Sequence, residues 1–294
     1  MKIGTVAWGW TLDPLEEPSG DSLHRISSSI AELGFDTIEL LGHRSSLKNY
    51  YTEQQTASLR RHIEELGLEI SGFVSSTQEL NHPKESQRLA VVDDFRRAAN
   101  TAVALGTNHV NLVVPYPSGA TMRPNTFRAP SDKFSLGIPA DYSWRDDWAR
   151  YTDSMHRCVE TAEKLGLRLS IECFPYTICS TPYAWMKLIE ELDSESFGIQ
   201  LDTAHLMNQK HDVIQAVHMT RDRIFNVHCK DTDGMARGNI PPGSGVIDYT
   251  EFIAALRTVG YDGVLSIEVE RTANPRRYVR QALIHLKECL AGAY

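Results

Sequence analysis

Residues 162–172 read AEKLGLRLSIE, and they join the end of an amphipathic stretch to a short apolar run. Glycine readily adopts the left-handed conformation that ends a helix, so we expect a helix to stop at Gly166. The apolar run that follows is typical of a strand buried on both faces of a parallel sheet. The same junction occurs at Leu33-Gly34, Leu66-Gly67, Leu105-Gly106 and Val259-Gly260. The sequence therefore predicts one helix-to-strand unit that is used repeatedly.

The repeat predicts eight strands that alternate with eight helices in an α/β protein. The strands are expected at residues 2–7, 37–41, 68–75, 109–114, 168–173, 197–202, 224–229 and 263–268. The helices are expected near residues 22–33, 53–66, 84–105, 144–165, 182–193, 211–220, 249–258 and 275–290. Strict alternation with short connections favours one closed (β/α)8 or TIM barrel, a single domain over residues 1–294. A doubly wound sheet usually has fewer strands and predicts a Gly-x-Gly-x-x-Gly loop, which the sequence lacks.

A long irregular segment follows the fourth expected strand. Residues 115–142 contain prolines at 115, 117, 124, 130 and 139, and the segment is too long for an ordinary strand-to-helix connection. Its position after a strand places it at the C-terminal mouth of the barrel. We expect a lid-like insertion or a partner surface there, and the alternative is a surface insertion without a function.

Composition and charge limit the possible partners. Of the 294 residues, 41% are hydrophobic and 23% are charged, as in an ordinary globular protein. The net charge of −8 would repel a phosphate backbone, so we expect no nucleic acid partner. No apolar run approaches the ~20 residues that span a bilayer, and no leader-like run follows Met1. The odd number of cysteines, five, indicates a reducing compartment. These features predict a cytoplasmic protein.

Four successive strands end in residues that bind metal ions. The fifth to eighth expected strands bring Glu172, Asp202, His228 and Glu268 to the C-terminal ends, which meet at one mouth of the barrel. Three carboxylates gathered there repel one another, and a divalent cation relieves that repulsion. The set is mostly hard, so it suits Mn²⁺, Co²⁺, Mg²⁺ or Fe²⁺ better than a thiolate-type zinc site. We expect one divalent ion, with Mn²⁺ first and Co²⁺ or Mg²⁺ as alternatives.

Other side chains near the same mouth are candidate substrate contacts. Lys230 has the reach to bind a substrate oxygen, or else it forms a structural ion pair with Asp231. Trp8 follows the first strand directly, and Glu39 lies near the end of the second, where it could bind a sugar hydroxyl; a structural role is the alternative for both. Aromatic side chains that could stack on a sugar or form an apolar wall are Trp8, Trp10, Phe73, Tyr116 and Phe174.

These runs resemble a known family. The segments IE (171–172), LDTAH (201–205), VHCKD (227–231), PGSGVIDY (242–249) and SIE (266–268) are similar to those of the xylose isomerase-like TIM barrels. They are most similar to the sugar phosphate isomerase/epimerase group, which includes D-tagatose 3-epimerase, hydroxypyruvate isomerase and inosose dehydratase. The resemblance implies that Glu172, Asp202, His228 and Glu268 bind the metal and that the two glutamates form the acid/base pair.

The resemblance also implies that His205 contacts a substrate oxygen near the metal. Two positions depart from the ketose 3-epimerases. Those enzymes carry another Glu shortly after the first ligand, where this sequence continues with Cys173 and Phe174. They also carry an Arg about six residues after the histidine ligand, a position occupied here by Gly234, and Arg237 is the nearest candidate for that substrate contact.

The predicted function is that of a divalent-metal-dependent sugar isomerase or epimerase, which acts on a ketose or keto-sugar by proton abstraction through a metal-bound enediolate. A lyase with the same site is the alternative, either an inosose dehydratase or an enzyme that cleaves a 3-oxo-glycoside or C-glycoside.

An AP endonuclease-like enzyme would need histidines at the ends of the third and fourth strands, which end in Val74-Ser75 and Val113-Val114. A non-catalytic barrel is the remaining alternative. The partner is a small-molecule sugar, with a homo-oligomer or a second subunit possible.

Overall fold

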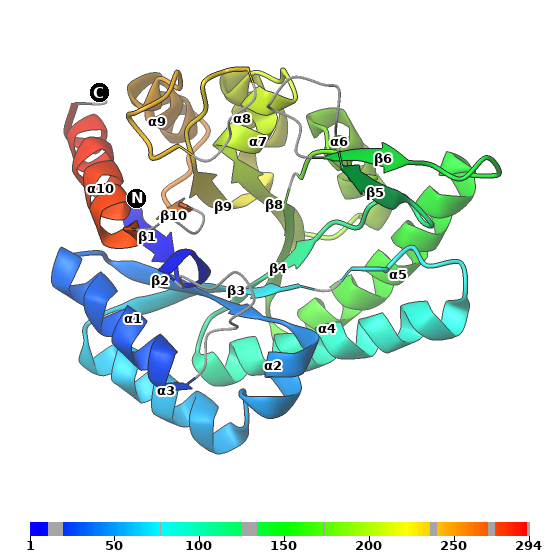
Figure 1. Ribbon diagram of the computed structural model, residues 1–294, viewed down its shortest axis with the longest axis horizontal. Helices are drawn as coiled ribbons and strands as arrows, with labels where there is room; N and C mark the ends of the chain where they lie inside the picture. The colour runs from blue at the N-terminus through cyan, green and yellow to red at the C-terminus, as the bar shows by residue number, and fades with distance from the viewer. Residues whose placement is uncertain are drawn as a thin grey trace.

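The computed structural model describes residues 1–10, 20–76, 78–124, 134–172, 174–235, 240–269 and 274–292, with backbone alone for 122–124 and 134–135. Eight parallel strands close into a barrel in the order β1-β10-β9-β8-β7-β4-β3-β2 (Figure 1). Their bounds are β1 Lys2–Val6, β2 Thr37–Gly42, β3 Glu69–Ser75, β4 His109–Val113, β7 Arg168–Glu172, β8 Phe197–Asp202, β9 Ile224–Cys229 and β10 Val264–Ile267. The predicted (β/α)8 barrel is confirmed.

Helices surround the barrel and follow the strands in sequence. The eight that correspond to the expected helices are α1 Gly20–Leu33, α3 Glu53–Glu65, α4 Glu85–Leu105, α5 Trp144–Leu165, α6 Pro182–Leu192, α8 Val213–Thr220, α9 Tyr249–Thr258 and α10 Pro275–Gly292. Short elements that the apolar pattern did not predict are α2 Arg44–Asn49, α7 Thr203–Asn208 and the 3-10 turns η1 Trp8–Trp10 and η2 Arg221–Arg223.

The repeated Gly junction works as expected. All five glycines of the predicted junctions have φ between 66° and 85°, the left-handed region that residues with a side chain rarely adopt. Gly106 and Gly166 cap α4 and α5, and their N–H groups donate to carbonyl oxygens of the last helical turn. The chain therefore leaves each helix in a fixed direction and enters the next buried strand.

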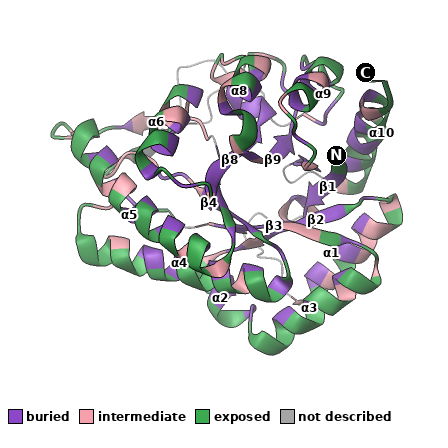
Figure 2. Ribbon diagram, turned by 180° about the vertical axis from the view of Figure 1, so that it is seen from behind, coloured by how far each residue is buried: buried purple, intermediate pink, exposed green. Residues whose placement is uncertain are grey.

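Burial follows this architecture. Figure 2 shows buried residues along the strands and on the helix faces turned toward them, with exposed residues on the outer helix faces. Ile38, Leu112, Leu169 and Ile199 are examples of fully buried strand residues that pack under the helices. No described helix is both long enough and apolar enough to cross a membrane.

The described part of the segment after β4 contains regular structure that the sequence did not predict. Within residues 115–142, β5 Thr121–Pro124 and β6 Phe134–Gly137 pair as an antiparallel hairpin. Its base is tied to α5, because Ser118 N donates to Asp147 Oδ2 over 2.9 Å and Arg150 Nη2 donates to Ser118 Oγ over 3.1 Å. Residues 125–133 lie outside the described part of the chain. A lid function for this segment stays a proposal.

Candidate metal centre

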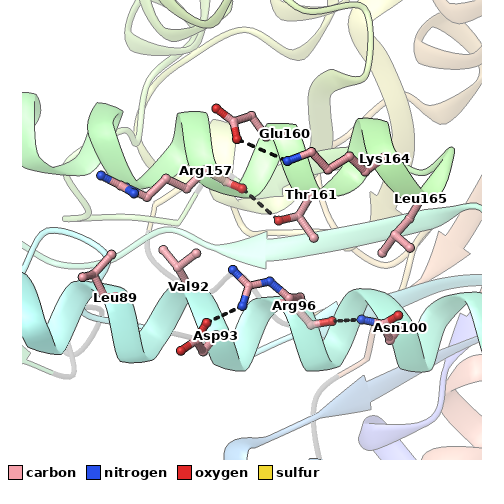
Figure 3. Close-up of a pocket in the computed structure, with 10 residues that line it drawn as sticks. All are labelled: Leu89, Val92, Asp93, Arg96, Asn100, Arg157, Glu160, Thr161, Lys164 and Leu165. Carbon is pink, nitrogen blue, oxygen red and sulfur yellow. Dashed lines mark hydrogen bonds and ion pairs between the residues drawn. The ribbon is translucent and has the colours of Figure 1, made fainter.

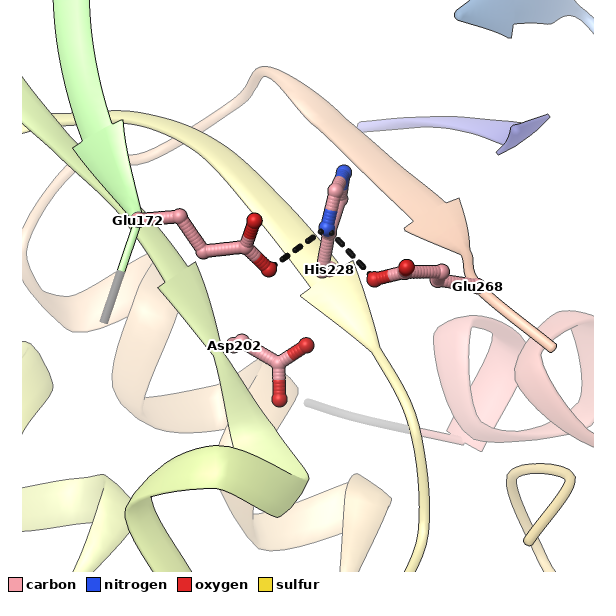
Figure 4. Close-up of side chains that lie close together, drawn as sticks. All are labelled: Glu172, Asp202, His228 and Glu268. Carbon is pink, nitrogen blue, oxygen red and sulfur yellow. Dashed lines mark hydrogen bonds and ion pairs between the residues drawn. The ribbon is translucent and has the colours of Figure 1, made fainter. Parts of the chain in front are cut away.

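The four proposed ligands converge at the C-terminal ends of adjacent strands. Glu172 and Asp202 are the last residues of β7 and β8, His228 lies one residue before the end of β9, and Glu268 follows β10. One ligand atom from each residue lies within 4.8 Å of the others. Figure 4 shows the side chains pointing toward one another, with the His228 ring between the two glutamates. The parallel register pairs Asp202 with His228, which keeps these two side chains on the same level of the barrel.

His228 is the centre of the cluster. Its Nδ1 atom lies 2.8 Å from Glu268 Oε2 and 3.2 Å from Glu172 Oε1. Asp202 completes the group and also caps α7, because its Oδ1 accepts a hydrogen bond from His205 N over 2.7 Å. His228 and Asp202 are fully buried, while Glu172 and Glu268 are 9% and 7% exposed. The cluster is therefore almost completely enclosed.

The acidic and basic groups of the cluster shift one another's pKa values. Burial lowers the pKa of His228, but the carboxylates of Glu39, Glu268 and Glu172 outweigh burial and hold its pKa well above the ordinary value. Burial raises the pKa of Glu268, yet Lys230 and His228 bring it well below the usual range. For Asp202 burial dominates, so its pKa is raised although Lys230 lowers it.

Lys230 lies inside the cluster. Its Nζ atom is 2.8 Å from Glu268 Oε2, 3.2 Å from Asp202 Oδ2 and 3.3 Å from His205 Nε2, and the residue is 2% exposed. The sequence offered an ion pair with Asp231 as one alternative, but the ion pairs of Lys230 are with Asp202 and Glu268. The Asp231 carboxylate instead accepts backbone hydrogen bonds from Thr232, Gly243, Gly245 and Ile247.

The candidate substrate contacts His205 and Trp8 lie beside the ligands. Burial, reinforced by Lys230, lowers the pKa of His205 to about 3, so its ring is neutral at ordinary pH. The ring of Phe174 lies 4.8 Å from that of His205, and Tyr116 lies 6.2 Å from Phe174. Trp8 Nε1 donates to Glu268 Oε1 over 3.2 Å. Trp8 therefore contacts a proposed ligand, whereas Phe174 and Tyr116 pack beside His205.

Three other expectations have different outcomes. Phe73 is fully buried and packs edge-on against Tyr51 at 5.1 Å, so of its two alternatives it fits an apolar wall and not stacking on a sugar. Glu39 is fully buried, and its Oε2 lies 3.1 Å from His228 Nε2, on the side of the ring away from the other ligands. This contact with a proposed metal ligand differs from the expected contact with a sugar hydroxyl. Arg237 lies outside the described residues.

A second polar layer beneath the ligands was missed. Each ligand is preceded two positions earlier by a buried polar residue, in the order Ser170, Gln200, Asn226 and Ser266. Since side chains two apart on a strand face the same way, these residues line the barrel interior directly below the cluster. The signal was present in the sequence as polar residues inside otherwise apolar strands. Which of them contact one another depends on the barrel register.

The residues fit a divalent ion. Three carboxylates and one imidazole, buried and mutually within 4.8 Å, are a ligand set of mostly hard donors. Glu172, Asp202, His228 and Glu268 would hold the ion, and the imidazole would bind through Nδ1, the nitrogen that faces the carboxylates.

A groove elsewhere on the surface lacks this convergence. It has a volume of about 500 Å³ and lies between α4 and α5 on the outside of the barrel (Figure 3). Its polar side chains bind within their own helices: Arg96 pairs with Asp93, Lys164 with Glu160, and Thr161 donates to the carbonyl oxygen of Arg157. No common ligand position is indicated among these described residues.

The fold and the site define a (β/α)8 barrel with a cluster of three carboxylates and one imidazole at its C-terminal mouth that could hold a metal ion. The model of the xylose isomerase-like TIM barrel family matches residues 28–289, and the chain belongs to this family. Inosose dehydratase of Geobacillus kaustophilus is 24% identical, with coverage of 96% of this chain and 92% of the relative. L-ribulose-5-phosphate 3-epimerase of Salmonella heidelberg is 23% identical, with 94% and 93% covered.

The fold also matches that of solved structures. The 3-keto-D-glucoside 4-epimerase of E. coli superposes with a TM-score of 0.75 and 22% identity, covering 98% of this chain and all of the other. The family recognised from the sequence is thus confirmed. Its relatives include epimerases and a dehydratase, which supports an enzyme of carbohydrate metabolism here.

Proposed function

We propose that this protein is a divalent-metal-dependent isomerase or epimerase that acts on a ketose or related keto-sugar. The observation that carries the proposal is the pair Glu172 and Glu268, which come from β7 and β10 and flank His228 Nδ1 at 3.2 and 2.8 Å. Two carboxylates around one position can serve as base and acid on either side of a substrate carbon. The expected ion is Mn²⁺, and the expected location is the cytoplasm.

The chain's own residues would divide the work as follows. One of the two glutamates removes the proton next to the substrate carbonyl, and the other returns a proton to the opposite face. When bound, the ion would supply positive charge next to the oxygen on which negative charge develops. His205 and Lys230 would donate hydrogen bonds or charge to substrate oxygens, and Trp8 with Phe174 would exclude water.

A lyase is the second candidate. The full-length similarity to an inosose dehydratase favours it, since 96% of this chain aligns with that relative. The buried Lys230 ammonium also provides a cation beside the acid/base pair that could assist a departing oxygen. Both candidates share the first step, removal of a proton next to a carbonyl, and they differ in what happens to the resulting carbanion.

Proton exchange tests the shared step. The Mn²⁺-loaded protein is incubated in D₂O with a panel of ketoses, inososes and 3-oxo-glycosides, and carbon-bound deuterium is followed by NMR. We expect incorporation with at least one member and a loss of about 10²–10⁴-fold in Glu172→Gln and in Glu268→Gln. The products distinguish epimerisation from loss of water or of an aglycone.

The control is Glu160→Gln, which makes the same chemical change on the outer face of α5, where Glu160 pairs with Lys164 at 3.6 Å. Its exchange rate should equal that of the wild type. Near wild-type exchange in either Glu172→Gln or Glu268→Gln, with the fold intact by circular dichroism, would remove that glutamate from the mechanism.

A further inference from the structure

Glu39 lies in the barrel directly behind the proposed metal ligands. It comes from β2 and is fully buried. Three groups converge on its Oε2 atom: Asn226 Nδ2 donates over 3.0 Å, Ser266 Oγ donates over 3.1 Å, and His228 Nε2 lies at 3.1 Å. Within the described part of the chain, its other oxygen, Oε1, has no hydrogen-bond partner. The carboxylate is thus aimed at His228 by donors from two neighbouring strands.

The backbone around Glu39 is shaped to admit this side chain. The pairing of β2 with β3 shifts by one residue between Ile38 and Glu39, so that Glu39 faces Gly72. Such an irregularity turns a side chain to a new direction. A Cβ atom at Gly72 would lie 2.8 Å from His109 Nδ1 and 3.7 Å from Glu39 Cδ, so a larger residue would crowd the space that these two side chains share.

Glu39 contacts the nitrogen of His228 that faces away from the proposed metal ligands. A neutral imidazole has one N–H donor and one nitrogen with a free lone pair, and a carboxylate beside one nitrogen holds the hydrogen there. Glu39 is at Nε2, whereas Glu172 and Glu268 are at Nδ1. We propose that Glu39 is a positioning residue that fixes the tautomer and the ring orientation of His228, so that Nδ1 is the atom offered to a divalent metal ion.

The polar layer below the ligands supports this arrangement mechanically. Asn226 donates to Gln200 Oε1 over 3.0 Å as well as to Glu39, which links β8, β9 and β2 through one amide. Ser266 adds β10. Carboxylate–histidine–metal triads of this kind strengthen the imidazole as a ligand, and their loss typically weakens metal binding 10- to 100-fold. The inference rests on the metal centre proposed above.

Metal affinity measures the role of Glu39. Mn²⁺ binding is titrated by calorimetry in the wild type, in Glu39→Met, which keeps the size but removes the acceptor, and in Glu39→Gln, whose amide oxygen can still accept from Nε2. We expect the Kd to rise about 10- to 100-fold in Glu39→Met and less in Glu39→Gln. Ser170→Ala is the control, because Ser170 lies in the same buried layer but bonds to His109 and Asn111. Its Kd should stay within about threefold of the wild type.

A spectroscopic signature separates positioning from general loosening of the barrel. In the Mg²⁺-loaded protein with ¹⁵N-labelled histidine, the His228 Nε2–H signal, identified by its absence in His228→Gln, should be present in the wild type and in Glu39→Gln and absent in Glu39→Met. Should Glu39→Met fail to fold, Ser266→Ala replaces it, because it removes a donor that orients Glu39 and leaves His228 in place.

The outcomes are distinct. If Glu39→Met and Glu39→Gln both fold and bind Mn²⁺ with the Kd of the wild type, the role of Glu39 is overturned and the metal centre stands. If Glu39→Met does not fold, a wild-type Kd in both Ser266→Ala and Glu39→Gln has the same meaning. Absence of Mn²⁺ binding to the wild type, or binding that survives His228→Gln unchanged, would overturn the metal centre and with it the inference.

Discussion

The buried histidine His109 makes the stability of the folded protein depend on pH. It lies on β4, is 1% exposed, and its Nε2 is 2.7 Å from Ser170 Oγ. Burial lowers the pKa of His109 to about 4, although Glu39 acts in the opposite direction. An unfolded chain has a histidine pKa of about 6.5, so between these values the unfolded state binds more protons than the folded state. The stability contributed by neutral His109 is therefore present above about pH 6.5 and is lost as pH falls toward about 4.

The corresponding prediction concerns acid destabilisation. Between about pH 7 and pH 5, the free energy of unfolding of the metal-free wild type should fall by about 1–2 kcal/mol more than that of His109→Gln. Urea titrations at the two pH values measure the difference. His218→Gln, which changes an exposed histidine on α8, should behave like the wild type. Equal pH dependence in wild type and His109→Gln would show that His109 is not held neutral.

At the scale of the elements, the conformation of the loop after β9 is held by the carboxylate of Asp231. Asp231 is fully buried, and its Oδ1 accepts from Thr232 N and Ile247 N while Oδ2 accepts from Gly243 N and Gly245 N, all between 2.9 and 3.1 Å. A Cβ atom at Gly245 would lie 2.2 Å from Asp231 Oδ1, so glycine is needed for this close approach. The loop thereby holds the chain that follows Lys230 against the mouth of the barrel.

Asp231→Asn should destabilise the protein by about 2–4 kcal/mol. The NH₂ group that replaces one carboxylate oxygen cannot accept a hydrogen bond, so two backbone N–H groups lose their acceptor. Chemical denaturation measures the loss. Asp248→Asn is the matched control, since Asp248 caps α9 through Thr250 N and Glu251 N, and asparagine caps a helix about as well. A change in Asp231→Asn no larger than in Asp248→Asn would mean that the four backbone bonds contribute little.

At the scale of the whole molecule, the proposed metal site lies where four adjacent strands of the closed barrel end. Strands β7, β8, β9 and β10 supply the ligands, and β10 pairs with β1 to complete the barrel. The site formed by these four strand ends exists only in the folded barrel. Binding of an ion therefore stabilises the folded state by about 2.7 kcal/mol when the free ion concentration is 100 times the Kd. Because the strands of a closed barrel unfold together, this stabilisation should raise the unfolding temperature of the whole barrel.

We therefore expect Mn²⁺ to raise the Tm of the chelator-treated protein by several degrees in one cooperative transition. Calorimetry at increasing Mn²⁺ concentration gives the shift. Asp202→Asn should fold, since asparagine still caps α7, yet show a much smaller shift, whereas Glu160→Gln should respond like the wild type. A Tm in the wild type that is independent of Mn²⁺ would contradict a metal centre.

The sequence alone determined the barrel and the ends of its strands. Gly-terminated amphipathic stretches and apolar runs act within a few residues, so the helices and strands could be predicted close to their observed bounds. Parallel topology then sends all strand ends to one mouth, which was sufficient to bring Glu172, Asp202, His228 and Glu268 together as a hypothesis. The hairpin β5–β6 and helix α7 escaped prediction because neither has an extended apolar pattern.

Only the tertiary structure decided how the side chains pair. Glu39 and His228 are 189 residues apart, and their contact depends on closure of the barrel and on the shifted register between β2 and β3. The sequence left Lys230 open between a substrate contact and an ion pair with Asp231, and in the structure its ammonium group pairs with Asp202 and Glu268. Local patterns encode which way a side chain faces, whereas the group it meets inside the barrel depends on the register and packing of strands that are distant in sequence.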